Sequence, residues 1–105
     1  MDVTPPIEIK PQDWSVVLRI LQEQVPGVEV WAFGSRARRT AKPYSDLDLA
    51  LITQQPLSLG KLASITEAFD NSDLPIRVDV VDWAATSETF RKIIERDKVV
   101  LQGGA

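Results

Sequence analysis

The chain has 105 residues, 44% of them apolar, and a formal net charge of −3 at pH 7. This length suits one domain, and the apolar share suits a packed core rather than a disordered chain. Because the sequence contains neither cysteine nor histidine, disulfides, zinc thiolates, thiol nucleophiles and imidazole bases are excluded. The acidic balance provides no general basic surface, so we expect no direct contact with nucleic acid.

The sequence shows no targeting signal. Its first ten residues include acidic residues and prolines but no apolar run of signal-peptide length. No stretch approaches the ~20 apolar residues of a membrane-spanning helix. We therefore expect a cytoplasmic protein with no membrane partner. Residues 1–105 are expected to form a single domain with short tails at 1–10 and 102–105.

The first half of the chain predicts a helix, a strand and a turn. The helix begins at Pro11, whose missing N–H costs little in a first turn, and it stops at Pro26-Gly27. Its apolar residues recur at helical spacing: Trp14, Val17, Leu18, Leu21 and Val25. Residues 28–33 are rich in β-branched and aromatic side chains and predict a strand, which is followed at once by Gly34-Ser35.

The second half predicts a helix at 57–70, a strand at 76–82, a last helix and a short edge strand at 99–101. Gly60 weakens the start of the first of these helices, and Thr86 or Ser87 can cap the last one. The apolar residues expected to face the core from the two helices are Leu62, Ile65 and Phe69, then Phe90, Ile93 and Ile94. Helices that alternate with strands imply an α/β fold in which helices cover a small mixed sheet.

Residues 46–52 alternate as a strand with two unlike faces. One face carries Leu47, Leu49 and Leu51, and the other carries Asp46, Asp48 and Ala50. Two carboxylates on the same face repel each other unless a cation lies between them, and Mg²⁺ is the usual cation where phosphates complete its shell. The alternative is that Asp46 marks a loop end and Asp48 faces solvent, which is the commoner origin of so short a pattern.

Gly34-Ser35 lies where a strand enters a helical turn. Free backbone N–H groups at such a turn bind phosphate, glycine permits close approach, and the serine hydroxyl adds a donor. An ordinary turn with serine as the helix cap is the alternative. Together the two patterns describe a pocket in which a triphosphate lies on Gly34 and Ser35 while metal ions connect it to Asp46 and Asp48.

The stretch GSRARRTAKPYSDLDL, residues 34–49, resembles the signature of the DNA polymerase β-like nucleotidyltransferases. It is similar to the minimal nucleotidyltransferases (MNT) in particular, and the similarity extends to RVDVVDW and the terminal IERDKVVL. The resemblance implies the nucleotidyltransferase fold and an enzyme that uses ATP or another nucleoside triphosphate with two Mg²⁺ ions. In the implied reaction a hydroxyl attacks the α-phosphorus and pyrophosphate leaves.

The family uses a third carboxylate on a later strand, and Asp79 matches that position. Asp82 is the competitor, but two strand residues three apart face opposite ways. The resemblance therefore implies Asp46, Asp48 and Asp79 as catalytic and metal-binding residues, with Gly34 and Ser35 as nucleotide-binding residues.

The sequence departs from the family at Arg39, where many members have glycine. A positive φ at this position would strain an arginine. The chain has one local basic cluster, made of Arg36, Arg38, Arg39 and Lys42. It either attracts the triphosphate or an acidic partner, or it is a solvated helix face.

Stand-alone minimal nucleotidyltransferases resemble antitoxins that are paired with a small helical HEPN toxin. The resemblance implies an antitoxin that transfers AMP to a hydroxyl, that of a tyrosine, of a cognate HEPN toxin and so silences it. Two alternatives stay open: a binding-only antitoxin that acts by contact, and a nucleotidyltransferase that modifies a small molecule or an RNA end. Trp83 and Tyr44 are candidates for a partner interface, whereas Trp31 is expected in the core.

Overall fold

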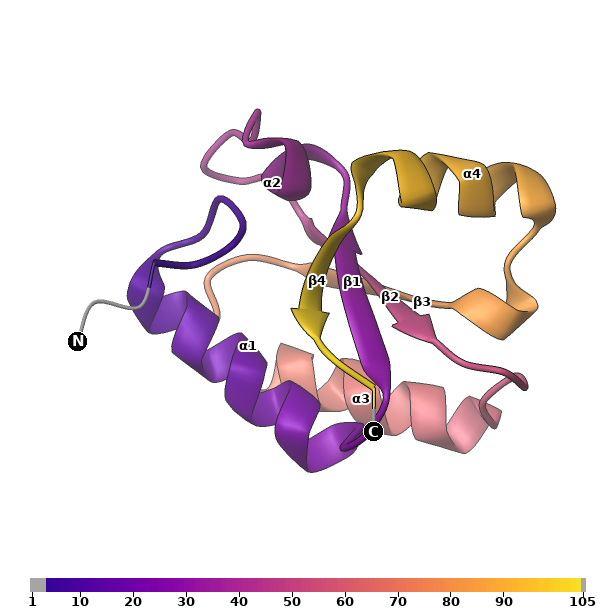
Figure 1. The fold of residues 1–105 in the computed structure, drawn as a ribbon. Coiled ribbons are helices and arrows are strands. Elements are labelled where there is room, and N and C mark those ends of the chain that lie inside the picture. Colours follow the sequence, from indigo (N-terminus) through magenta and orange to yellow (C-terminus); the bar gives the residue numbers. More distant parts are fainter. Residues whose placement is uncertain (1–3, 105) are drawn as a thin grey trace.

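The computed structural model describes residues 4–104 and contains one mixed four-stranded sheet in the order β3-β2-β1-β4. Strand β1 pairs antiparallel with both β2 and β4, and β2 pairs parallel with β3. Helices α1 and α3 lie on one face of the sheet and α4 lies on the other (Figure 1). The expected fold class is therefore confirmed. The elements are α1 (Pro11–Gln24), β1 (Glu29–Phe33), α2 (Ser35–Arg38), β2 (Leu47–Ile52), α3 (Leu59–Asp70), β3 (Val78–Asp82), the 3₁₀ turn η1 (Trp83–Ala85), α4 (Glu88–Asp97) and β4 (Val99–Gln102).

The main core lies between the sheet and helices α1 and α3. The leucines of β2 all point into it and are fully buried: Leu47, Leu49 and Leu51. Helix α1 adds Trp14, Val17, Ile20 and Leu21, and α3 adds Ile65 and Phe69. A second, smaller core under α4 is built from Trp31, Phe33, Ala50 and Ile94. Strand β2 is thus covered on both faces, as the middle layer of the fold.

Two expected tails belong to the folded unit. Ile7 is only 1% exposed and lies in the main core, and Pro5 is buried as well. At the other end Gln102 belongs to β4, and its Nε2 donates 2.8 Å hydrogen bonds to the carbonyls of Val25 and Val28. The prediction of loose ends at 4–10 and at 102 is therefore wrong, while residues 1–3 and 105 lie outside the described residues.

Capping serines mark the starts of α3 and α4. Ser58 accepts a hydrogen bond from the Lys61 N–H, so α3 begins at Leu59, two residues later than expected. Ser87 caps α4 by accepting from the Phe90 N–H, whereas the Thr86 hydroxyl donates to the Asp82 carbonyl. Ser87, not Thr86, is the cap.

One expected core residue of α4 is misplaced. Ile93 is 40% exposed. Its neighbour Ile94 faces the second core instead, together with Phe90, which precedes Ile94 by one helical turn. No helix within residues 4–104 is both long and apolar enough to cross a bilayer.

Candidate nucleotidyltransferase site

The Gly-Ser turn and the paired aspartates meet at one edge of the sheet. Gly34 lies between β1 and α2 with φ 78° and ψ −159°, a conformation that only glycine adopts readily. A Cβ at this position would overlap Asp48 Oδ2 and lie 3.3 Å from Asp48 Cγ. Gly34 is therefore required by its backbone and by the space that the Asp48 carboxylate takes. The turn that can receive phosphate lies against the carboxylate that can hold a cation.

Strand register brings the second and third carboxylates together. Asp48 lies opposite Phe33 in the antiparallel pair and opposite Asp79 in the parallel pair. Residues in register share a face, so Asp48 and Asp79 are neighbours on the face that α4 covers. Asp46 precedes β2 by one residue, and its charge is felt by Asp48. Asp48 and Asp46 are half-buried, whereas Asp79 is exposed.

The electrostatics of the site favour a bound cation. Burial raises the pKa of the Asp48 carboxyl, and the negative charges of Asp79 and Asp46 raise it further. Arg38 and Arg77 act in the opposite direction. An all-oxygen donor set with mutual repulsion fits a hard divalent ion such as Mg²⁺. Within residues 4–104 no three acidic side chains already converge as ligands of one ion, so the carboxylates share an edge rather than form a closed cage.

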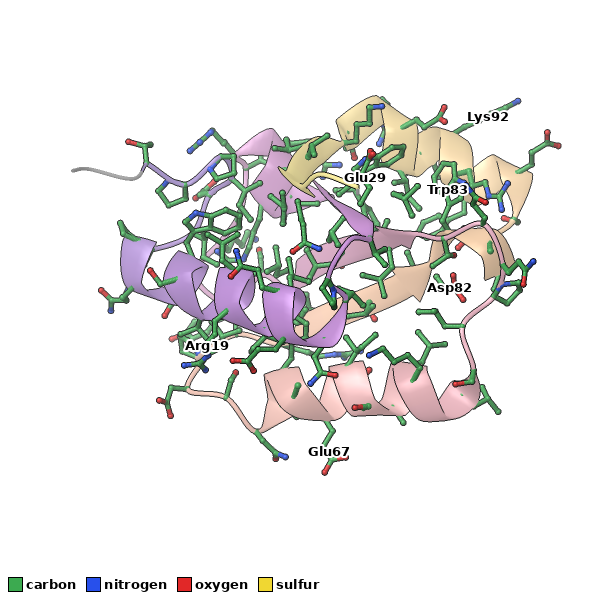
Figure 2. All side chains as sticks on the ribbon, turned by 60° about the horizontal axis from the view of Figure 1, so that its bottom comes forward. Arg19, Glu29, Glu67, Asp82, Trp83 and Lys92 are labelled. Atoms are coloured by element: carbon green, nitrogen blue, oxygen red, sulfur yellow. The ribbon has the colours of Figure 1, made fainter. Side chains whose placement is uncertain are left out.

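Asp82 has a different task from Asp79. It is buried at the end of β3 on the side of α3, as Figure 2 shows. Its carboxylate accepts hydrogen bonds from the Thr53 hydroxyl and, at 2.7 Å, from the Leu57 N–H. Asp82 thereby closes the loop between β2 and α3. The predicted alternation is confirmed: of the two acids of β3, only Asp79 shares the face of Asp48.

The basic cluster does not act as one unit. Arg38 Nη1 donates to Asp97 Oδ2 at 2.7 Å and links α2 to the end of α4. Arg39 adopts the left-handed conformation, with φ 60° and ψ 39°, and its Nη2 donates to the Pro5 carbonyl at 3.0 Å. The positive φ considered for Arg39 is thus present. Lys42 lies further along, in the exposed turn before β2.

Arg36 is a buried structural residue that sequence reasoning missed. It is 6% exposed, and its guanidinium donates to the carbonyls of Ser45 at 2.9 Å, Glu8 at 2.8 Å and Pro43 at 3.3 Å. Three carbonyl partners satisfy its donors and fix the loop that leads to Asp46. Only its place directly after Gly-Ser could have singled it out, because its partners come from distant segments.

The aromatic residues divide as their exposure indicates. Trp31 is buried, as expected, and Trp83 packs edge-on against it with ring centroids 5.2 Å apart. Lys98 Nζ lies 4.2 Å from the Trp31 ring centroid and covers it from outside. Tyr44, by contrast, is 92% exposed.

A strand that leads into Gly34-Ser35 and lies beside the strand of Asp48 is the arrangement that the sequence motif predicts for a nucleotidyltransferase. The family model described as the nucleotidyltransferase domain matches residues 15–102, and the chain belongs to this family. The chain is 52% identical over 96 residues to the probable protein adenylyltransferase MntA of Haemophilus influenzae. The aligned residues make up 91% of this chain and 84% of that protein. The resemblance to minimal nucleotidyltransferases is confirmed.

Solved structures share the fold. A toxin-antitoxin crystal structure with AMP-PNP superposes with a TM-score of 0.74 at 22% identity and covers 87% of this chain and 73% of that chain. A tri-AMPylated Shewanella oneidensis HEPN toxin in complex with MNT antitoxin matches with a TM-score of 0.62 at 18% identity, over 90% of this chain and 73% of that chain. At these identities the likeness concerns the fold.

Proposed function

We propose that this protein transfers AMP from ATP to a hydroxyl, that of a tyrosine, of a cognate HEPN toxin, and that it serves as the antitoxin of that toxin in the cytoplasm. In this proposal residues 1–105 act as a single minimal nucleotidyltransferase domain. One observation supports it most: a Cβ on Gly34 would overlap Asp48 Oδ2, so the Gly-Ser turn and the Asp48 carboxylate lie directly against each other. A phosphate on the turn would therefore be next to a cation held by the carboxylates. The 52% identical relative is a probable protein adenylyltransferase, and the similar folds occur in toxin-antitoxin complexes.

The nucleotide is held by Gly34 and Ser35. The missing side chain of Gly34 lets phosphate oxygens approach the backbone, and the Ser35 hydroxyl adds a donor. Arg38 lies near enough to favour the charged form of Asp48, so it also contributes positive potential toward a triphosphate.

Asp46, Asp48 and Asp79 are the residues that would hold Mg²⁺. Bound Mg²⁺ lowers the pKa of an attacking hydroxyl and neutralises the leaving pyrophosphate. The chain itself has no histidine to serve as base. Asp79 is the exposed member of the set and can accept the proton of the attacking hydroxyl and pass it to solvent. The more buried Asp48 stays next to the phosphate turn.

Intact-mass measurement of the HEPN partner tests this proposal. The partner is incubated with Mg²⁺–ATP and either wild type, Asp46→Ala or the control Asp73→Ala, whose residue is an exposed loop acid away from the site. We expect one or more AMP units on the partner with wild type and with Asp73→Ala, and none with Asp46→Ala. No mass change, together with full neutralisation of the toxin by Asp46→Ala, would show that contact alone is the function.

A further inference from the structure

We propose that Tyr44 of one copy of this protein accepts AMP at the active site of a second copy, so that the protein modifies itself in trans. This inference rests on the proposed function, because it uses the same site and the same nucleotide. It adds an acceptor that lies within the enzyme's own chain.

Tyr44 is accessible enough to serve as an acceptor. It is the only tyrosine of the sequence, and its side chain is 92% exposed. An aromatic ring that is not packed against its own chain can enter another active site without unfolding anything. A phenol also loses its proton more readily than the aliphatic hydroxyls of serine and threonine, which makes it the better nucleophile beside a metal-activated site.

Hydrogen bonds hold the backbone of the turn that carries Tyr44. The Ser45 N–H donates to the Lys42 carbonyl at 3.0 Å, which closes a four-residue turn with Pro43 and Tyr44 at its centre. The Lys42 N–H donates to Ser45 Oγ at 2.9 Å, so the turn is closed twice. On its buried side, the turn is held by Arg36, which donates hydrogen bonds to the carbonyls of Pro43 and Ser45. Because the backbone of the turn is already held, ordering it on binding costs little entropy.

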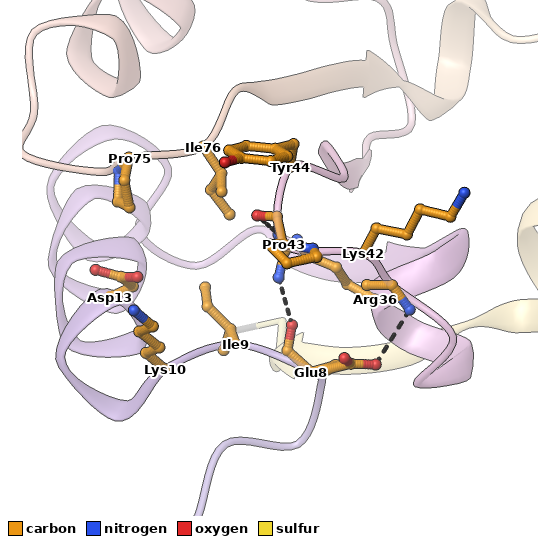
Figure 3. Close-up of a pocket in the computed structure, with 11 residues that line it drawn as sticks. Glu8, Ile9, Lys10, Asp13, Arg36, Lys42, Pro43, Tyr44, Pro75 and Ile76 are labelled. Atoms are coloured by element: carbon orange, nitrogen blue, oxygen red, sulfur yellow. Dashed lines mark hydrogen bonds between the residues drawn. The ribbon is translucent and has the colours of Figure 1, made fainter.

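The pocket that Tyr44 lines contains none of the carboxylates Asp46, Asp48 and Asp79. Tyr44 lines this pocket of about 500 Å³ on the side of Pro75 and Ile76, across from Ile9 and Lys10 (Figure 3). Ile9 and Ile76 pack against the main core, on the face of α1, whereas Asp48 and Asp79 lie on the face of α4. The Tyr44 hydroxyl therefore reaches an active site most directly when that site belongs to another copy.

The reaction balances with ATP as the only co-reactant. The Tyr44 Oη attacks the α-phosphorus, the Pα–Oη bond forms, and the bond between Pα and the oxygen that bridges to the β-phosphorus breaks. Pyrophosphate leaves, and the phenolic proton passes to Asp79 of the copy that acts as enzyme and then to solvent. The products are AMP-tyrosine, pyrophosphate and one proton.

A mixing experiment separates acceptor from enzyme. Tyr44→Phe keeps the ring and supplies an active copy with no acceptor, whereas Asp48→Asn supplies an inactive copy that still carries Tyr44. The two are mixed with Mg²⁺–ATP and each is weighed by intact mass. We expect one AMP on the Asp48→Asn copy and none on the Tyr44→Phe copy. The control acceptor, Asp48→Asn combined with Tyr44→Phe, should remain unmodified, and peptide mapping should place the AMP on Tyr44.

The outcomes distinguish this inference from the proposed function. If Tyr44→Phe transfers AMP to the HEPN partner but leaves the Asp48→Asn copy unmodified, the inference is overturned and the function stands. AMP on the control acceptor would also overturn it, because another residue would then be the acceptor. If wild type transfers AMP to neither partner nor itself, the proposed function fails as well.

Discussion

The two faces of strand β2 differ in burial and in charge. Toward α1 and α3 it presents three fully buried leucines, and toward α4 it presents Asp48 and then Ala50. The first face removes apolar area from water and so stabilises the fold. The second keeps half-buried charge beside exposed charge, which costs stability unless a cation binds. Folding and chemistry are thus assigned to opposite sides of one strand, and substitutions should separate them.

The largest effect on stability is expected at the leucine face. Leu49→Ala should lower the free energy of unfolding by ~2–5 kcal/mol, because it leaves a cavity at a fully buried site. Leu59→Ala is the control, since Leu59 is 86% exposed, and it should change stability by no more than ~0.5 kcal/mol. Urea unfolding measures both. A loss at Leu49 no larger than that at Leu59 would remove the distinction between the faces.

The next effect is expected at Gly34, where the aspartate face of β2 meets the Gly-Ser turn. Gly34→Ala should cost ~1–3 kcal/mol, because its backbone conformation is strained for any side chain and the added Cβ meets Asp48. Gly60→Ala is the matched control: Gly60 lies in α3 with open space around it, and alanine there should add ~0.5–1 kcal/mol. If Gly34→Ala and Gly60→Ala changed the free energy of unfolding in the same direction, the geometry assigned to Gly34 would be contradicted.

A smaller effect is expected at the link between α2 and α4. Hydrogen bonds from Arg96 and Arg38 lower the pKa of the Asp97 carboxyl. A carboxyl with a lowered folded-state pKa adds stability above its unfolded pKa, and this stability is lost as pH falls through the folded-state pKa. Asp97→Asn should therefore cost at most ~1 kcal/mol at neutral pH and nothing in acid, because the Asp97 side chain is only 4% exposed but its partners Arg38 and Arg96 are 46% and 66% exposed.

Thermal unfolding across pH measures the Asp97 effect. The control Arg96→Gln removes the other arginine but keeps the 2.7 Å bond from Arg38. AMP transfer should slow only in Asp97→Asn, in which Arg38 loses its charged partner beside the active site. Equal slowing in both variants would show that α4 stability, not Arg38, is responsible.

An effect of similar size is expected at Arg39. Its left-handed backbone costs an ordinary residue ~1–2 kcal/mol, but the bond from its side chain to the Pro5 carbonyl offsets part of this cost. Arg39→Ala removes the bond and keeps the strain, whereas Arg39→Gly removes both. The glycine variant should be more stable than the alanine variant by ~1 kcal/mol in urea unfolding. The reverse order would mean that the backbone is not left-handed in solution.

Local periodicity explains which features could be predicted from the sequence. Alternation along β2 and β3 distinguished the leucine face from the aspartate face and Asp79 from Asp82, because side-chain direction in a strand follows from position alone. The meeting of Gly34 with Asp48 was expected from the combined motif. The catalytic and metal-binding roles of the site residues stay predictions.

Features that depend on distant segments could not be predicted in the same way. Arg36 is buried because Glu8, Pro43 and Ser45 bring three carbonyls to it, and no single stretch of sequence contains that arrangement. Ile7 was expected in a tail, since a short segment with prolines has no helical or strand period, yet it completes the main core. The sequence does not distinguish Ile93 from Ile94, because the spacing of apolar residues in this helix allows either of the two adjacent residues to face the core.

Asp48→Asn tests the central claim most directly, because one substitution should move stability and chemistry in opposite directions. A carboxyl whose folded-state pKa is raised loses stability as pH rises through that pKa, so the metal-free wild type carries a cost at neutral pH. The account predicts that Asp48→Asn has a melting temperature a few degrees higher than that of wild type in metal-free buffer at neutral pH. This difference should become smaller as the pH is lowered to the range in which aspartates ordinarily titrate. AMP transfer by Asp48→Asn should be lost. An unchanged or lower melting temperature, or transfer that persists in Asp48→Asn, would contradict the account.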